Sequence, residues 1–470
     1  MKAKPLTTLI RILISAVLVL LPVFLICMYI RLFPMNYADG EAPYYFWNRD
    51  VSRSSSDRRY RVLILGDSAA NAAYLPEVLS EDTINLSLGG TTPVENYYVL
   101  SDWLNAHEAP ETVFLSFMDY HMIYDNMFYE RTVYAHRLTP SQEREVLSEA
   151  RDCQDENIAI KDAEEQLFQY DHYLPQKYLP ALLNAGFSSR RAENEAHYAA
   201  VSLHRGAYIG LSDAVYMDTD PNVYDSYVVN PLYDRYYRKI LALCQEKGIQ
   251  ARIISLPKTG NSVLTERFHN QRDGYYEALA EEYPCAQYDA RIETMDNRCF
   301  LDWEHFNTSG AWLFSSRLRR MYPDVFHEEV PSDETLIGQL EYLKLIPQPD
   351  QLLNCLNNDY FSALLITQDS RLALLSGAED TGIRLGSKTI WLKSRVIEKV
   401  LYNENDGRDT SVSFVINEDG SQAVRLGENW LPVTVDDYAG ATVILLSHRN
   451  SAAAEVRNYL KDGTGYVLKK

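Results

Sequence analysis

The sequence predicts an α/β protein: a three-layer domain on a parallel sheet with a helical insertion, one transmembrane helix before it and a smaller α+β domain after it. Three observations support this prediction. An uncharged apolar run lies near the N-terminus, short apolar runs alternate with helix-like runs across residues 58–328, and strand-like runs prevail in residues 336–470. Strands that alternate with helices indicate a parallel sheet covered by helices.

The first element expected is a membrane helix. Residues 12–30 carry no charge, and a helix of that length nearly matches a hydrocarbon core of about 30 Å. Basic residues precede the run and acidic residues follow it (Lys2, Lys4, Arg11; Asp39, Glu41). The positive-inside rule then predicts a cytoplasmic N-terminus, a single-pass anchor over residues 1–35 and an extracytoplasmic remainder. A cleaved signal peptide is the alternative, but the run exceeds a usual h-region and no small-x-small site follows.

The rest of the chain divides by its pattern. Residues 36–57 are aromatic and polar and are expected to form a juxtamembrane linker. In the domain over residues 58–328, apolar runs predict strands, helix-like runs separate them, and residues 119–225 read as the helical insertion. The strand candidates are residues 61–66, 84–88, 112–117 and 251–256.

The composition bears on which ligands and partners are expected. The formal net charge is −20 and no extended basic patch occurs, so nucleic acid is not expected to bind. The six cysteines lack CxxC spacing, and no metal or organic cofactor is implied. A disulfide between Cys285 and Cys299 is left open.

Three residues have the chemistry of a nucleophile and its charge partners. Ser68 comes directly after the first strand candidate, where a helix N-terminus offers N–H groups. A serine hydroxyl needs a base that a carboxylate holds in place. Asp302 and His305, three residues apart, can form that pair on a turn. Oxyanion donors are expected from the backbone N–H of Ser68 and that of Gly89 or Gly90.

These motifs resemble the blocks of the SGNH/GDSL hydrolase superfamily. The matching residues are Gly66-Asp67-Ser68, the glycine after the second strand, and Asp302-x-x-His305 followed by Asn307 and Gly310. The resemblance covers roughly residues 58–322 and implies a flavodoxin-like sheet with a catalytic triad of Ser68, His305 and Asp302.

One block departs from the superfamily pattern. Gly-x-Asn-Asp is usual after the third strand, whereas this chain has Ser116-Phe117-Met118-Asp119-Tyr120-His121. The missing amide donor would have to be replaced by Asn71 or by a side chain from residues 119–121. His121 is itself a candidate functional histidine, although a strand-end residue that caps or binds water is the favoured interpretation.

With its N-terminal anchor, the chain looks most like bacterial envelope proteins of teichoic acid D-alanylation and of alginate or peptidoglycan O-acetylation. That resemblance implies an O-acyltransferase or acylesterase acting on a cell-surface glycopolymer, beside the membrane and a multi-pass membrane acyltransferase. The alternative is a non-catalytic polymer-binding or scaffold protein on a hydrolase-like fold.

Overall fold

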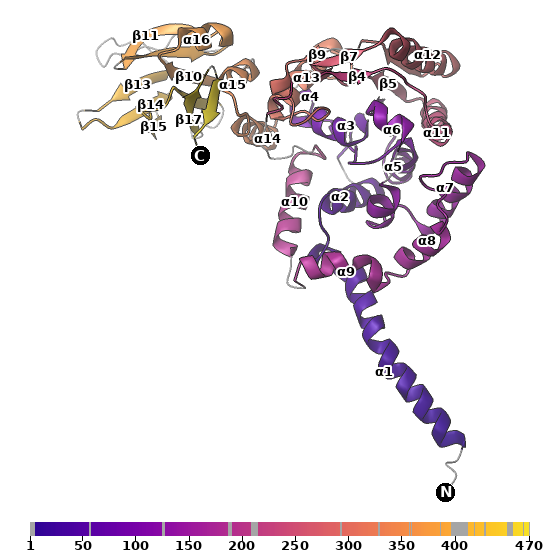
Figure 1. Ribbon diagram of the computed structural model, residues 1–470. Helices are drawn as coiled ribbons and strands as arrows, with labels where there is room; N and C mark the ends of the chain where they lie inside the picture. Colours follow the sequence, from indigo (N-terminus) through magenta and orange to yellow (C-terminus); the bar gives the residue numbers. More distant parts are fainter. Residues whose placement is uncertain are drawn as a thin grey trace. The chain divides into compact units, whose positions relative to one another are not determined.

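The computed structural model describes residues 5–55, 58–124, 127–186, 190–207, 215–291, 294–327, 330–356, 358, 360–385, 387–395, 412–417, 419–426, 429–448, 455–463 and 465–469 (Figure 1). Lys2 and Lys4, and the expected domain limits at residues 57 and 328, lie outside this part. The contacts divide the chain into two compact units. The first comprises residues 1–208, 219–295 and 322–328, and the second comprises residues 209–218, 296–321 and 329–470.

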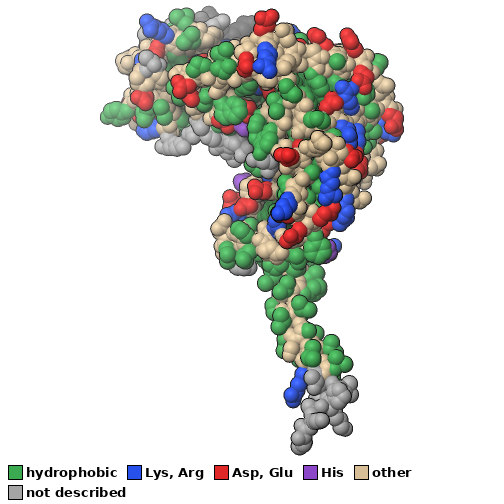
Figure 2. Space-filling view, turned by 45° about the vertical axis from the view of Figure 1, so that its right-hand side comes forward, with side chains coloured by type: hydrophobic (Ala, Val, Ile, Leu, Met, Phe, Trp, Pro, Cys, Tyr) green, Lys and Arg blue, Asp and Glu red, His purple; other side chains and the backbone are tan. Residues whose placement is uncertain are grey.

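The N-terminal helix α1 (Pro5–Leu32) is long and apolar enough to cross a membrane over Leu9–Leu32. Its side chains are exposed from residue 9 to residue 26, and Figure 2 shows hydrophobic groups along its visible length. Exposed apolar side chains of this extent are typical of a helix that can cross a membrane.

The expected linker contains a helix of its own, α2 (Ala42–Arg53), which follows the short turn η1 (Pro34–Asn36). Tyr45, Phe46 and Trp47 are buried on α2, so the aromatic residues that suggested a partly packed linker belong to the core of the first unit. The physical reason is the large apolar area that these rings remove from water.

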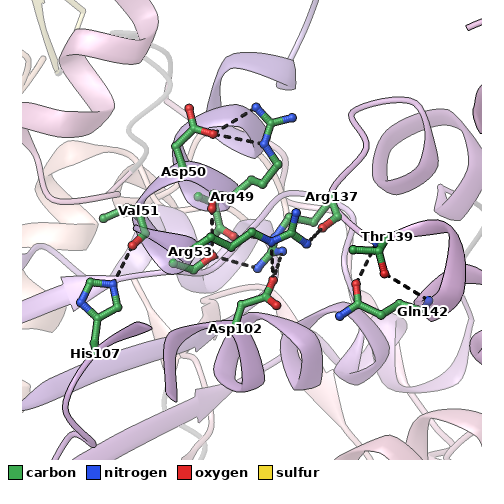
Figure 3. A network of polar contacts seen from close by, with 11 residues as sticks. Arg49, Asp50, Val51, Arg53, Asp102, His107, Arg137, Thr139 and Gln142 are labelled. Carbon is green, nitrogen blue, oxygen red and sulfur yellow. Dashed lines mark hydrogen bonds and ion pairs between the residues drawn. The ribbon is translucent and has the colours of Figure 1, made fainter. Parts of the chain in front are cut away.

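A polar network fastens α2 to α5 (Pro93–Ala106), as Figure 3 shows. The carboxylate of Asp102 accepts hydrogen bonds from Arg53 at 2.9 Å and from the fully buried Arg137 at 2.8 Å. Arg137 also donates to the side chain of Asn48 at 2.8 Å. Because a buried guanidinium is costly without partners, this set of bonds favours one position of α2.

The first unit is built on a five-stranded parallel sheet in the order β2-β1-β3-β5-β8. This is the strand order of flavodoxin-type doubly wound sheets, so the predicted mixed α/β fold with a parallel sheet is confirmed. The strands are β1 (Val62–Gly66), β2 (Thr83–Asn85), β3 (Thr112–Ser116), β5 (Gln250–Ile254) and β8 (Ala286–Asp289). The connecting helices are α3 (Ser68–Ala73), α4 (Pro76–Leu79), α5, α11 (Pro231–Lys247) and α12 (Glu266–Glu282).

The predicted insertion between β3 and β5 is mainly helical. It contains α6 (Asp119–Ile123), the π-helix η2 (Phe128–Val133), α7 (Pro140–Asp152), α8 (Ala163–Asp171), α9 (Pro175–Asn184), α10 (Arg191–Leu203) and the short strand β4 (Asn222–Tyr224). Two small parallel pairs accompany the sheet: β4 with β7 (Ser262–Leu264), and β6 (Lys258–Thr259) with β9 (Thr294–Met295).

The second unit combines helices with antiparallel sheets. Its helices are η3 (Asn297–Cys299), α13 (Thr308–Met321), α14 (Asp333–Lys344), α15 (Pro349–Cys355) and α16 (Ser370–Ser376). One sheet has the order β11-β12-β10-β16-β17-β18 and the other β13-β14-β15. Their strands are β10 (Phe361–Thr367), β11 (Glu379–Leu385), β12 (Lys388–Lys393), β13 (Val412–Ile416), β14 (Gln422–Leu426), β15 (Asn429–Val433), β16 (Ala441–Ser447), β17 (Glu455–Asp462) and β18 (Gly465–Leu468). All six cysteines are free thiols, so Cys285 and Cys299 form no disulfide.

Glu143 of α7 makes stability depend on pH. Burial, together with the nearby charge of Asp171, raises the pKa of Glu143 to about 9. Because its pKa in the unfolded chain is about 4.3, the folded state retains the proton and loses stability as pH rises from about 5 toward 9. We expect the neutral variant Glu143→Gln to melt at a higher temperature than the wild type at pH 8 and at the same temperature at pH 4.

Differential scanning fluorimetry of the full chain checks this expectation. Glu165→Gln, at an exposed position of α8, is the matched control and should show no pH-dependent gain. Equal melting temperatures for wild type and Glu143→Gln at pH 8 would contradict the prediction.

Candidate active site

Ser68 begins α3 immediately beyond β1, at the carboxyl edge of the parallel sheet. It is partly exposed, whereas every other residue from Val62 to Leu79 is buried. Gly66 permits this turn, because a Cβ atom there would lie 2.0 Å from the carbonyl oxygen of Ser116 on β3. The chain thus places a partly exposed serine at the point where neighbouring connections diverge from β1 and β3, which is where open α/β sheets bind ligands.

The carboxyl group of Asp67 organises the turn beneath Ser68. One oxygen accepts the backbone N–H groups of Ala69 at 3.0 Å and Ala70 at 3.3 Å, which caps α3. The other oxygen accepts the backbone N–H of Met118 at 2.6 Å and the Nδ1 of His121 at 2.9 Å. Asp67 is fully buried, so these bonds fasten the end of β1 to the segment that follows β3.

His121 therefore belongs to the scaffold of the Ser68 turn. It is 7% exposed and lies on α6. The favoured sequence interpretation, a capping residue at a strand end, is close to what the structure shows, but the sequence did not identify Asp67 as its partner. No signal in the spacing could have done so, since the contact joins residues 54 positions apart.

The neighbouring Asp119 forms ion pairs with two basic side chains. Its carboxylate lies 2.7 Å from the ammonium of Lys258 and 3.1 Å from the guanidinium of Arg272, and all three residues are buried. Burial opposes the charge on Asp119, but the two cations outweigh it and hold its pKa below the usual value. An ionised carboxylate offers no hydrogen-bond donor, so Asp119 does not replace the missing amide.

Asn71 was the other proposed replacement for that donor. Its amide nitrogen donates to the backbone oxygens of Ser87 at 2.9 Å and Gly206 at 2.7 Å, and the residue is 4% exposed. An amide nitrogen has two hydrogens, and both are used within the protein. The expected oxyanion role of Asn71 is therefore corrected to a structural one: it ties α3 to the loops after β2 and α10.

The glycine pair after β2 is shaped by packing. A Cβ atom on Gly89 would lie 1.8 Å from a carboxylate oxygen of Glu41, and one on Gly90 would lie 2.8 Å from a guanidinium nitrogen of Arg131. Glu41 and Arg131 form an ion pair of 2.7 Å. Gly90 also has φ +65°, which favours glycine. These contacts explain why glycine occupies both positions. The role of their backbone N–H groups as oxyanion donors stays a prediction.

Asp302 and His305 form the pair that their spacing predicts. The carboxylate accepts the backbone N–H groups of Glu304 at 2.9 Å and His305 at 2.8 Å, and it lies 2.9 Å from Nδ1 of the His305 ring. Burial opposes the charge on Asp302, but the hydrogen bonds from His305 outweigh it and lower its pKa. A proton on Nδ1 is the tautomer that these bonds favour, and in that tautomer Nε2 is the ring nitrogen with the lone pair.

The segment that carries this pair is anchored to α13. The amide of Asn307 donates to the backbone oxygen of Arg298 at 2.7 Å and accepts the N–H of Gly310 at 3.1 Å. A Cβ atom at Gly310 would lie 2.1 Å from the backbone oxygen of Cys299. Asn307 and Gly310 in the sequence block thus hold the first turn of α13 against the residues before Asp302.

The two parts of the expected triad lie in different compact units, Ser68 in the first and Asp302 with His305 in the second. The structure brings Asp302 and His305 together and joins Asp67, the residue before Ser68, to His121. The alignment of Ser68 with His305 stays a prediction. Among the described residues, no group of three or more His, Cys, Asp or Glu side chains is placed to hold a metal ion. No family model and no curated protein matches this chain.

Proposed function

We propose that the chain transfers acyl groups outside the cytoplasmic membrane, with Ser68 as nucleophile, His305 as base and Asp302 as the residue that orients His305. The observation that supports this most is the exposure of Ser68 alone within a buried run at the carboxyl edge of the sheet. Ser68 is not needed as the cap of α3, because the side chain of Asp67 already caps that helix.

In the proposed reaction, Oγ of Ser68 attacks the carbonyl carbon of an acyl donor while its proton passes to Nε2 of His305. The leaving alcohol or thiol takes that proton, and an acyl ester remains on Ser68. Water or a sugar hydroxyl then attacks the ester and gives its proton to His305. His305 passes this proton to the leaving Oγ of Ser68 as the acid or the acylated sugar is released. Backbone N–H groups of Ser68 and of Gly89 or Gly90 are the proposed oxyanion donors.

The proposed acceptor is a cell-surface glycopolymer, from the resemblance to envelope acyl-transfer proteins. The apolar helix α1 supports a location beside the membrane, with the N-terminus proposed to be cytoplasmic. A multi-pass membrane acyltransferase is the proposed source of the acyl group. Hydrolysis and transfer use the same acyl-enzyme and differ only in the acceptor.

One observation favours a second candidate, a non-catalytic polymer-binding or scaffold protein. The superfamily's usual amide donor is absent, and neither Asn71 nor Asp119 supplies a replacement. A site with fewer oxyanion donors loses catalysis but can still bind a polymer.

Fluorophosphonate labelling separates the two candidates. The full chain in detergent is treated with the probe, and the adduct is located by mass spectrometry in wild type, Ser68→Ala and His305→Ala. Ser101→Ala, which removes a partly exposed serine of α5, is the matched control. We expect an adduct on Ser68 that is lost in the first two variants and retained in the control. A folded wild type without any adduct would favour the binding protein.

A further inference from the structure

The end of α1 is fastened to the insertion helix α9. Ile30 of α1 is fully buried in a cluster that includes Tyr37 and, from α9, Tyr178 and Leu182. The hydroxyl of Tyr37 donates to the backbone oxygen of Ile30 at 2.9 Å, and its ring meets that of Tyr178 edge-on at 5.9 Å. Figure 1 shows α9 at the point where α1 joins the first unit. The level of α9 along the membrane normal is therefore set by α1.

That level can be estimated from the sequence of α1. The stretch from Arg11 to Arg31 is a helix without another charge, and its twenty steps of about 1.5 Å span a hydrocarbon core of about 30 Å. Arg31 then lies at the outer interface. Its guanidinium lies 5.8 Å from the ring of Tyr173, and Tyr29 packs against Phe33 at 5.5 Å. Arginine and aromatic rings are typical of this zone.

The exposed face of α9 carries two leucines, beside Pro180 and the polar Gln176 and Asn184. Tyr178, Ala181 and Leu182 are buried, whereas Leu179 is 43% exposed and Leu183 is 58% exposed. Residues four apart lie on the same side of a helix, so the two leucines form one apolar face that no described part of the chain covers.

We infer that α9 lies in the membrane–water interface, with Leu179 and Leu183 in contact with lipid. The occupant is lipid because α9 packs against the end of α1, at the height where α1 leaves the hydrocarbon core. Leu32 and Phe33, at the end of α1, are also exposed, by 58% and 45%, and extend the same apolar zone. A short amphipathic helix in this position holds the folded unit against the bilayer and limits its rotation about α1. This inference rests on the proposed anchorage of α1 in the membrane and is independent of the proposed acyl transfer.

Photocrosslinking in the membrane tests the inference. The photoreactive residue p-benzoylphenylalanine replaces Leu179 or Leu183 in the full chain, which is placed in nanodiscs of phosphatidylethanolamine and phosphatidylglycerol. The control position is Val263, which is 47% exposed in the same unit. Its strand β7 lies away from α1 in Figure 1. All three side chains are exposed, so the replacements should leave folding intact, and a melting curve verifies this.

We expect lipid adducts at positions 179 and 183 at least several-fold above those at position 263. Three outcomes would overturn the inference: no lipid adduct at either leucine, equal lipid adducts at all three positions, or adducts at 179 and 183 that join a second copy of the chain. The last result would identify a protein interface.

Discussion

Asp302→Asn is expected to lower the turnover of a Ser68-dependent ester by about 10⁴-fold, the loss that the same exchange causes in a serine triad. Asp302 accepts the ring Nδ1–H of His305 and two backbone N–H groups. An asparagine can turn its NH₂ group toward Nδ1, which favours the wrong tautomer and leaves Nε2 unable to accept the serine proton. The variant should fold normally, because the wild-type side chain is 48% exposed.

The measurement is kcat with an activated acyl ester for wild type, Asp302→Asn and the control Asp333→Asn, whose carboxylate is exposed in the first turn of α14. Because the pKa of Asp302 is lowered in the folded state, its ionised form persists below its usual pKa of about 3.9 and is lost only at still lower pH. Asp302 therefore does not limit the wild-type rate above about pH 4. Undiminished turnover in Asp302→Asn would exclude it from the triad.

Asp67→Ala is expected to destabilise the first unit by roughly 4 kcal/mol or more. It leaves four buried donors without their acceptor: the N–H groups of Ala69, Ala70 and Met118, and Nδ1 of His121. Each unsatisfied buried donor costs about 1–3 kcal/mol. Since a domain is stable by only about 5–15 kcal/mol, this one change approaches the limit for folding.

Chemical denaturation followed by far-UV circular dichroism checks this prediction. Thr139→Ala removes an exposed helix cap of the same unit, that of α7, and should cost only about 1 kcal/mol. His121→Ala removes one of the four donors and should have a smaller effect than Asp67→Ala. A loss for Asp67→Ala no larger than that for Thr139→Ala would show that the four bonds do not stabilise the turn as argued.

Local sequence pattern was enough to predict several features of this protein. The apolar run of α1 and the alternation of strands and helices needed only hydrophobic periodicity, because burial along one element repeats within a few residues. The Asp302–His305 contact was predictable for the same reason, since a turn of three residues brings the side chains together. Gly66 was recognised in the sequence only as part of the Gly-Asp-Ser block, and its close approach to β3 is seen in the structure.

Only the tertiary structure decided the contacts between distant segments. Asp67 is hydrogen-bonded to His121. The amide of Asn71 donates to the backbone oxygens of Ser87 and Gly206. Gly89 lacks the Cβ atom that would clash with Glu41. Hydrogen bonds of buried polar groups depend on which strands and loops become neighbours, and that neighbourhood is set by packing of the whole unit. The sequence by itself therefore determined the main elements and the local Asp–His pair, and the folded chain decided which distant polar side chains hold the scaffold together.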